Sequence, residues 1–163
     1  MKKIYIIGPA SAGKTTLAKK IQQQQSLPVL NLDNIFWQKK YTVTYTSKEK
    51  KLLLKEFLKT NFKSGWIIEG APQDFLQKTS QAATKIIWLN PNIFVLFYRT
   101  IKRFIITKFF TTKINNQETL KSTYKIIKGI ISYKLKNKLY HHHKQIYLQH
   151  PQAQIYTQPR PDL

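Results

Sequence analysis

The chain has 163 residues, and its 28 lysines and arginines against 7 aspartates and glutamates give a formal net charge of +21. Hydrophobic residues make up 42% of it, which excludes a disordered chain and suffices for the buried core of one ordinary domain. Cysteine is absent, so disulfides, thiolate metal sites and cysteine nucleophiles are excluded.

The positive charge predicts attraction to polyanions, which include nucleic acid, anionic lipid and nucleotides. Lysine greatly outnumbers arginine, a pattern that biased genomic base composition would also produce, so charge alone does not select a partner. Two lysines and an apolar run open the chain, but that run has four residues, too few for a secretory signal. The longest later apolar run, residues 93–98, is too short to span a bilayer. We therefore expect a soluble, cytoplasmic protein.

The first half of the chain alternates short apolar strands with helices. Residues 2–7 predict a buried strand, and a helix begins near Gly13 and continues through Leu17, Ala18 and Ile21. Residues 28–32 predict a second strand, and residues 47–62 predict a helix with an apolar side. Alternation of this kind indicates a parallel sheet covered by helices on both faces.

Further strands are predicted at residues 66–68 and 85–89, and a fifth at residues 153–157. Between the last two, residues 93–113 and 117–149 are long basic stretches with a helical pattern. Neither an internal repeat nor a linker is evident. We therefore expect one P-loop-type domain over residues 1–163, of which the part from about 92 to 149 is basic and helical.

Residues 8–15 match the spacing G-x-x-x-x-G-K-[ST], between a predicted strand and a predicted helix. Gly8 and Gly13 permit backbone angles that point successive amides at phosphate oxygens. Lys14 would then neutralise the β- and γ-phosphates, and the Thr15 hydroxyl would reach Mg²⁺. The pattern predicts a Walker A loop that binds ATP or GTP with magnesium. The phosphate-binding residues that we expect are Gly8, Pro9, Ala10, Ser11, Ala12, Gly13, Lys14, Thr15 and Thr16.

An acidic residue at the end of a neighbouring strand usually completes the magnesium site of such proteins, and Asp33, Glu69 and Asp74 are the candidates. Glu69 is favoured for the metal because it ends an apolar run and precedes Gly70; the alternative is an ordinary polar strand end. Asp33 also follows a strand, and we expect it to contact or deprotonate the phosphoryl acceptor. Its alternative role is to cap the helix that follows it.

Arg99 and Arg103 are four residues apart and so share one face of a helix. Guanidinium groups suit phosphate, so the pair predicts neutralisation of charge on the transferred group, against the alternative of solvated surface arginines. Arg160, after the last strand, is a weaker candidate nucleotide ligand.

Three other features favour structural interpretations. Trp37 is expected in the core rather than stacked on an acceptor ring. Consecutive histidines on a helix do not share a face, so residues 141–143 predict a solvated tract rather than a metal site. An apolar helical stripe is expected to pack on the sheet, with a membrane-surface or nucleic-acid face as the alternative. Its members are Ile126, Ile127, Ile130, Ile131, Leu135 and Leu139.

Over residues up to about 105, the sequence resembles small P-loop kinases of the adenylate-kinase-related group, and most closely the bacterial topology modulation proteins. Besides the P-loop, residues 32–37 (Leu-Asp-Asn-Ile-Phe-Trp), 66–70 (Trp-Ile-Ile-Glu-Gly) and 86–90 resemble segments of that family. The resemblance implies a five-stranded parallel sheet with a helical lid that carries Arg99 and Arg103, and ATP-Mg binding. Gln73 stands where adenylate kinases have a phosphate-gripping arginine, which argues against adenylate kinase activity, and Asn90 stands where the family usually has Asp.

The leading hypothesis is therefore an ATP-dependent phosphotransferase acting on a nucleotide, nucleoside or similar small metabolite, with ATP and Mg²⁺ as cofactors. The alternative is an ATP-binding, DNA-associated protein whose basic helices contact phosphate backbones. Peripheral membrane association through the basic stripe opposite the apolar one, at Lys125, Lys128 and Lys136, is a third possibility. The sequence names neither the acceptor nor the oligomeric state.

Overall fold

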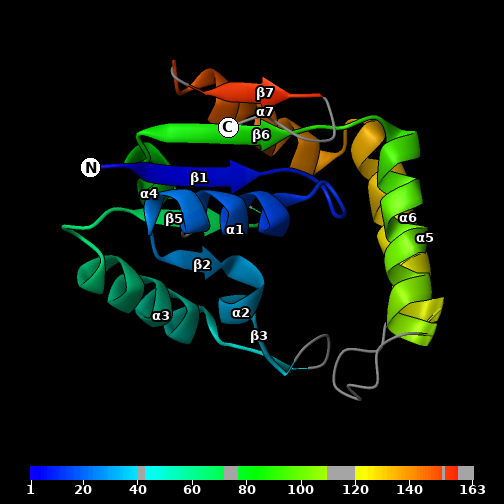
Figure 1. Cartoon of the computed structure of the whole chain (residues 1–163), viewed down its shortest axis with the longest axis horizontal. Coiled ribbons are helices and arrows are strands. Elements are labelled where there is room, and N and C mark those ends of the chain that lie inside the picture. The colour runs from blue at the N-terminus through cyan, green and yellow to red at the C-terminus, as the bar shows by residue number, and fades with distance from the viewer. Residues whose placement is uncertain (40–42, 72–76, 110–119, 152, 158–163) are drawn as a thin grey trace.

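Five parallel strands form the central sheet, in the order β2-β5-β1-β6-β7 (Figure 1). The computed structural model describes all residues except 40–42, 72–76, 110–119, 152 and 158–163. The predicted five-stranded parallel sheet is thereby confirmed. Its strands are β1 (Lys3–Ile7), β2 (Val29–Asn31), β5 (Trp66–Glu69), β6 (Lys85–Leu89) and β7 (Gln154–Tyr156).

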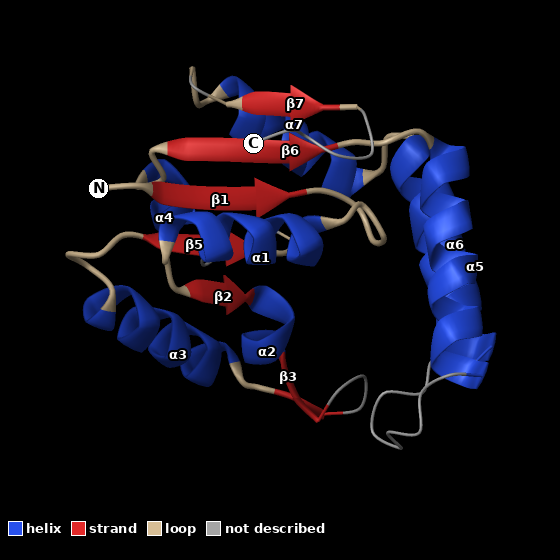
Figure 2. Cartoon of the chain, viewed as in Figure 1, coloured by secondary structure: helices blue, strands red, loops and turns tan. Residues whose placement is uncertain are grey.

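Helices flank the sheet, and a short antiparallel pair of strands follows the second helix (Figure 2). The described helices are α1 (Lys14–Gln25), α2 (Leu32–Phe36), α3 (Ser47–Thr60), α4 (Gln77–Gln81), α5 (Ile93–Phe109), α6 (Leu120–Lys134) and α7 (Lys138–Leu148). The additional strands are β3 (Trp37–Lys39) and β4 (Val43–Thr44).

The core consists of two apolar layers, one on each face of the sheet, and the central strand β1 contributes to both. Ile4 and Ile6 join a buried cluster with side chains of α1, α5 and α6, whereas Tyr5 and Ile7 join a second cluster with side chains of α2, α3 and α7. Successive side chains of a strand point to opposite faces, so burial of both faces requires the continuous apolar run that the sequence shows here. Helices packed on both faces of the sheet therefore fix the positions of the carboxyl ends of β1 and β5.

The predicted helical stretch at residues 117–149 contains two helices. α6 ends at Lys134, Lys136 adopts a positive φ of 58°, and the Asn137 side chain accepts a hydrogen bond from the Tyr140 amide to cap α7. The helical pattern is confirmed over the described part of this stretch, but the chain reverses between the two helices at a non-glycine residue. The predicted helical stretch at residues 93–113 is confirmed as far as Phe109, and its last four positions lie outside the described residues.

Candidate active site

The loop between β1 and α1 is the segment predicted to bind phosphate, and we call it the phosphate loop. Gly8, Ser11 and Gly13 all adopt positive φ, at 151°, 60° and 96°. A Cβ atom on Gly8 would lie 2.4 Å from the Leu89 carbonyl oxygen, so only glycine lets the loop pass so close to β6. Gly13 forms the N-cap of α1 without a side-chain hydrogen bond, and the positive end of the helix therefore faces the loop.

The Lys14 side chain folds back over this loop. Its Nζ donates to the carbonyl oxygens of Gly8 and Pro9, at 3.1 and 2.8 Å. Burial lowers the pKa of Lys14, the negative charges of Glu69 and Asp33 oppose that shift, and the positive charge of Arg103 adds to it. An anion entering the loop would supply the negative charge that favours the ammonium form.

Thr15 and Glu69 join α1 to the end of β5. The Thr15 hydroxyl donates a 2.7 Å hydrogen bond to Oε1 of Glu69, and Glu69 is only 2% exposed. Burial raises the pKa of the Glu69 carboxyl, while Thr15 and Lys14 act to lower it. Magnesium is usually held by one or two protein oxygens together with phosphate oxygens and waters. A hydroxyl and a carboxylate at this distance, beside Lys14, fit that donor set.

Asp33 lies in the first turn of α2 and is exposed. The helix cap is Asn31, whose side chain accepts from the Asp33 amide at 2.7 Å, so capping by Asp33 was the wrong alternative. Asn31 pairs with Glu69 across the β2–β5 register, and the Asp33 charge acts on the pKa of both Lys14 and Glu69. The two carboxylates therefore lie at the same edge of the sheet as the phosphate loop.

Arg99 connects α5 to the loop. Its Nη1 donates to the Ala12 carbonyl oxygen at 2.8 Å and lies 3.2 Å from the position that a Cβ on Gly13 would take. Arg103, one turn later, is exposed, and its charge acts on the pKa of Lys14. Both arginines of the predicted pair thus face the side of α5 where the phosphate loop lies.

Thr100 makes a second contact between α5 and the loop, and no pattern in the sequence signals it. Its buried hydroxyl donates to the Leu96 carbonyl oxygen at 2.8 Å and lies 2.7 Å from Oγ of Ser11. Because the Thr100 hydrogen is committed to Leu96, Ser11 is the donor to Thr100. This bond accompanies the positive φ of Ser11.

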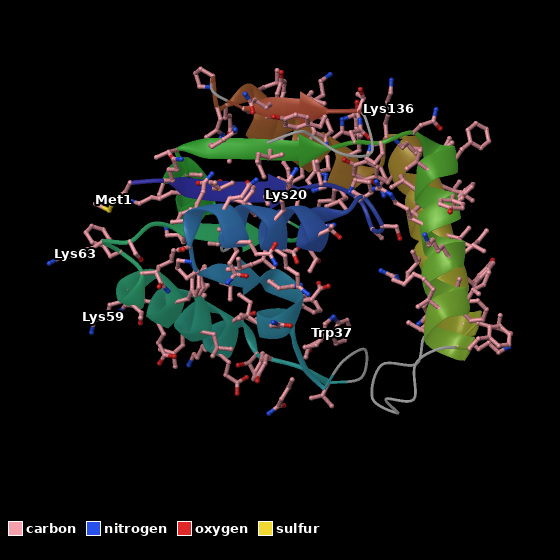
Figure 3. The ribbon with its side chains drawn as sticks, in the orientation of Figure 1. Met1, Lys20, Trp37, Lys59, Lys63 and Lys136 are labelled. Atoms are coloured by element: carbon pink, nitrogen blue, oxygen red, sulfur yellow. The ribbon has the colours of Figure 1, made fainter. Side chains whose placement is uncertain are left out.

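The other candidate residues divide into exposed and undescribed positions. Thr16 is exposed on α1, next to the phosphate loop. Trp37 is half-buried with its ring edge-on to Phe36 at 4.9 Å, and Figure 3 places it near the carboxyl ends of the strands. Asp74, Gln73 and Arg160 lie outside the described residues.

The histidine tract is not simply solvated, because His143 is completely buried. Trp88 Nε1 donates to the Tyr133 hydroxyl at 2.8 Å, and that hydroxyl lies 2.7 Å from His143 Nδ1. Burial, with smaller contributions from Lys14 and His142, lowers the pKa of His143 to about 3. The imidazole is neutral and ties α7 to α6 and β6. Within the described ranges, no group of three or more histidines and carboxylates is placed to hold a metal.

Asn90, just after β6, is held by α6. Lys134 Nζ donates to Asn90 Oδ1 at 2.8 Å, and partial burial lowers the pKa of Lys134. A lysine from the C-terminal helices therefore reaches the same sheet edge as the phosphate loop, a contact that the sequence did not predict.

Comparison with known proteins identifies the fold. The shikimate kinase from Bacteroides thetaiotaomicron superposes with a TM-score of 0.57 at 18% sequence identity, over 99% of this chain and 89% of that chain. No protein-family model and no curated protein sequence matches the chain. The resemblance to topology modulation proteins thus stays a prediction. None of the described helices is long and apolar enough to cross a membrane. The chain therefore shares the fold of this shikimate kinase, with a parallel five-stranded sheet between helices.

Proposed function

We propose that the protein is an ATP-dependent phosphotransferase that acts on a nucleotide, nucleoside or similar small metabolite. The observation that carries the proposal is the convergence of Lys14, Thr15, Glu69 and Arg99 on one loop with a helix N-terminus behind it. Fold likeness alone does not define an activity. The chemistry of these side chains is what supports the proposed activity.

Each group has a role in phosphoryl transfer. The loop amides and Lys14 would bind the phosphates of ATP, and Arg99 and Arg103 would neutralise charge on the phosphoryl group in transit. Thr15 and Glu69 would hold Mg²⁺, which neutralises phosphate charge when bound. Positioning and electrostatics supply most of such catalysis.

Asp33 is the proposed group on the acceptor side. It is exposed, and it is close enough to act on the pKa of Lys14 and Glu69. Its carboxylate would take the proton of the acceptor hydroxyl as the acceptor oxygen bonds to the γ-phosphorus and the bond to the β-phosphate oxygen breaks, which releases ADP. We also propose that residues 1–163 act as one domain, since β7 belongs to the same sheet as β1.

Calorimetry with ATP and magnesium, followed by a panel of acceptors, tests this proposal. We expect the unsubstituted chain to bind ATP-Mg and to phosphorylate one acceptor class. Lys14→Ala should lose turnover while keeping its fold, whereas Lys20→Ala, at an exposed position on the same helix, should keep both. Absence of triphosphate binding, or full turnover by Lys14→Ala, would remove the phosphotransferase assignment.

A further inference from the structure

The outer face of α5 carries an exposed row of apolar side chains, which we call the outer stripe. Its exposed fractions run from 44% at Ile105 to 76% at Phe94. The members of the outer stripe are Phe94, Tyr98, Ile101, Ile105 and Phe109. Spacings of three and four residues place them along one side of the helix. Single exposed apolar residues are ordinary, but a contiguous row of five marks an interaction surface.

The opposite side of α5 already has its partners. Leu96 and Thr100 are fully buried, and Arg99 and Thr100 contact the phosphate loop. α5 packs beside α6 at one end of the molecule, beyond the carboxyl ends of the strands (Figures 1 and 2). Figure 3 shows side chains along α5 that extend away from the sheet. A partner could therefore cover the outer stripe without disturbing the core.

Lysines border the outer stripe. Lys102 Nζ lies 5.9 Å from the centroid of the Tyr98 ring, and Lys108 Nζ lies 5.5 Å from that of Phe109. Neither α5 nor α6 contains an aspartate or glutamate, while each contains four lysines or arginines. Water-facing helices normally carry charges of both signs. A surface with cations only, around an apolar row, is complementary to a partner that is both anionic and apolar.

We infer that the outer stripe docks α5 onto an anionic lipid surface, with the helix in the plane of the interface. The apolar side chains would insert among the acyl chains, and Lys102 and Lys108 would contact the anionic headgroups. A second copy of this chain is disfavoured because the two acid-free helix pairs would repel each other. Nucleic acid is disfavoured because Ile101 and Ile105, in the centre, can neither stack on bases nor donate hydrogen bonds.

This surface lies on the other side of α5 from the loop contacts of Arg99 and Thr100. Bound in this way, the protein would keep the phosphate loop open to water-soluble ligands. The inference does not depend on the proposed phosphotransferase activity, and its test needs no nucleotide.

Sedimentation with lipid vesicles tests the docking surface. The full chain is mixed with phosphatidylcholine vesicles that contain phosphatidylserine, and with vesicles of phosphatidylcholine alone. We expect pelleting with the first only. The double variant Ile101→Gln/Ile105→Gln should bind the anionic vesicles about tenfold less tightly, since two aliphatic side chains leave the interface. A matched control, Leu52→Gln/Phe62→Gln, removes two exposed apolar residues in α3 and just after it, and should bind as the unsubstituted chain does.

Three results would overturn the inference. The chain could fail to pellet with anionic vesicles, or the α5 variant and the control variant could bind them equally, in which case net charge alone accounts for binding. The α5 substitutions could also weaken binding to single-stranded DNA or dissociate a dimer while leaving lipid binding intact. Circular dichroism of each variant shows whether the substitutions leave the helices in place. Phe94→Ser, at the N-terminal end of the outer stripe, provides a second variant that should also weaken binding to anionic vesicles.

Discussion

Thr15 on the first turn of α1 donates its hydroxyl hydrogen to Glu69 at the end of β5, across 2.7 Å. The residues are 54 positions apart in the chain. A carboxylate buried to this degree costs free energy unless it is hydrogen-bonded or meets a cation. Thr15 supplies such a hydrogen bond and Lys14 a nearby positive charge, yet burial still raises the pKa of the Glu69 carboxyl. Part of the desolvation cost of the carboxylate therefore remains, and a bound metal ion would offset it.

Glu69→Gln should separate these two contributions. The amide oxygen can still accept from Thr15 and the buried negative charge is removed, but the buried Lys14 loses a neighbouring negative charge, so stability should change by no more than about 1 kcal/mol. Magnesium-dependent turnover should fall on the order of 10²-fold, because a neutral amide holds Mg²⁺ weakly. Thermal unfolding and a magnesium titration of turnover measure the two effects. Glu56→Gln, exposed on α3, is the control; equal turnover of the two variants would contradict a metal role for Glu69.

Sequence reasoning located the sheet because buried parallel strands leave a strong signal. β1, β5 and β6 are buried on both faces and read as uninterrupted apolar runs. The β3–β4 pair was missed because its strands are only three and two residues long, too short for an alternating pattern to show. The break after α6 was missed because Lys136, and not glycine, takes the positive φ there.

For the candidate site, the sequence predicted the local motif but not the contacts between distant segments. The motif at residues 8–15 could be recognised because its residues are close neighbours in the chain, at a fixed spacing. The hydrogen bond between Ser11 and Thr100 spans 89 positions, and no local pattern indicates it. The burial of His143 likewise results from α7 packing on β6 and α6 through Trp88 and Tyr133.

Arg99→Ala should reduce turnover strongly and destabilise the fold only slightly. The substitution removes the bond to the Ala12 carbonyl oxygen and the charge beside Gly13. We expect kcat/KM for ATP to fall on the order of 10²-fold, with a loss of about 1 kcal/mol in unfolding free energy. Arg99→Lys should restore little of the activity, because an ammonium lacks the planar fork of donors.

Steady-state kinetics and chemical denaturation of the Arg99 variants measure these losses. Lys102→Ala removes a cation from the exposed side of the same helix and should leave kcat/KM unchanged. If the Arg99 and Lys102 variants lost activity equally, the effect would belong to the overall charge of α5 and not to the loop contact.

Two glycine-to-alanine substitutions should have opposite effects on stability. Gly70 has a φ of 142°, and a Cβ there would lie 2.7 Å from the Leu32 Cβ, so Gly70→Ala should cost roughly 1–3 kcal/mol. Gly129 lies in α6, and a Cβ added to it would meet nothing within 4 Å. Gly129→Ala should therefore stabilise the protein by about 0.5–1 kcal/mol. Urea denaturation of both variants measures the two changes in unfolding free energy. A stabilising Gly70→Ala would show that the turn after β5 differs from the one described.

His143 should make the protein sensitive to acid. In the folded state its pKa is lowered to about 3 by burial, whereas an unfolded chain would protonate it near the ordinary value of 6.5. Between these values the unfolded state binds the extra proton. The unfolding free energy should therefore fall as pH decreases from about 6.5 towards 3, by about 1 kcal/mol per pH unit. Glu69, whose pKa is raised, acts in the opposite sense above pH 4.5.

His143→Gln tests this dependence, with His141→Gln at an exposed position as the control. The His143 variant should be less stable at neutral pH, because the imidazole fills the core beside Tyr133 and Trp88. Its unfolding free energy should nevertheless decrease less steeply with acid than that of the control. Urea denaturation at a series of pH values gives both slopes. Identical slopes would mean that His143 is protonated in the folded state, which the Tyr133 hydroxyl could accommodate only by donating its hydrogen to another acceptor.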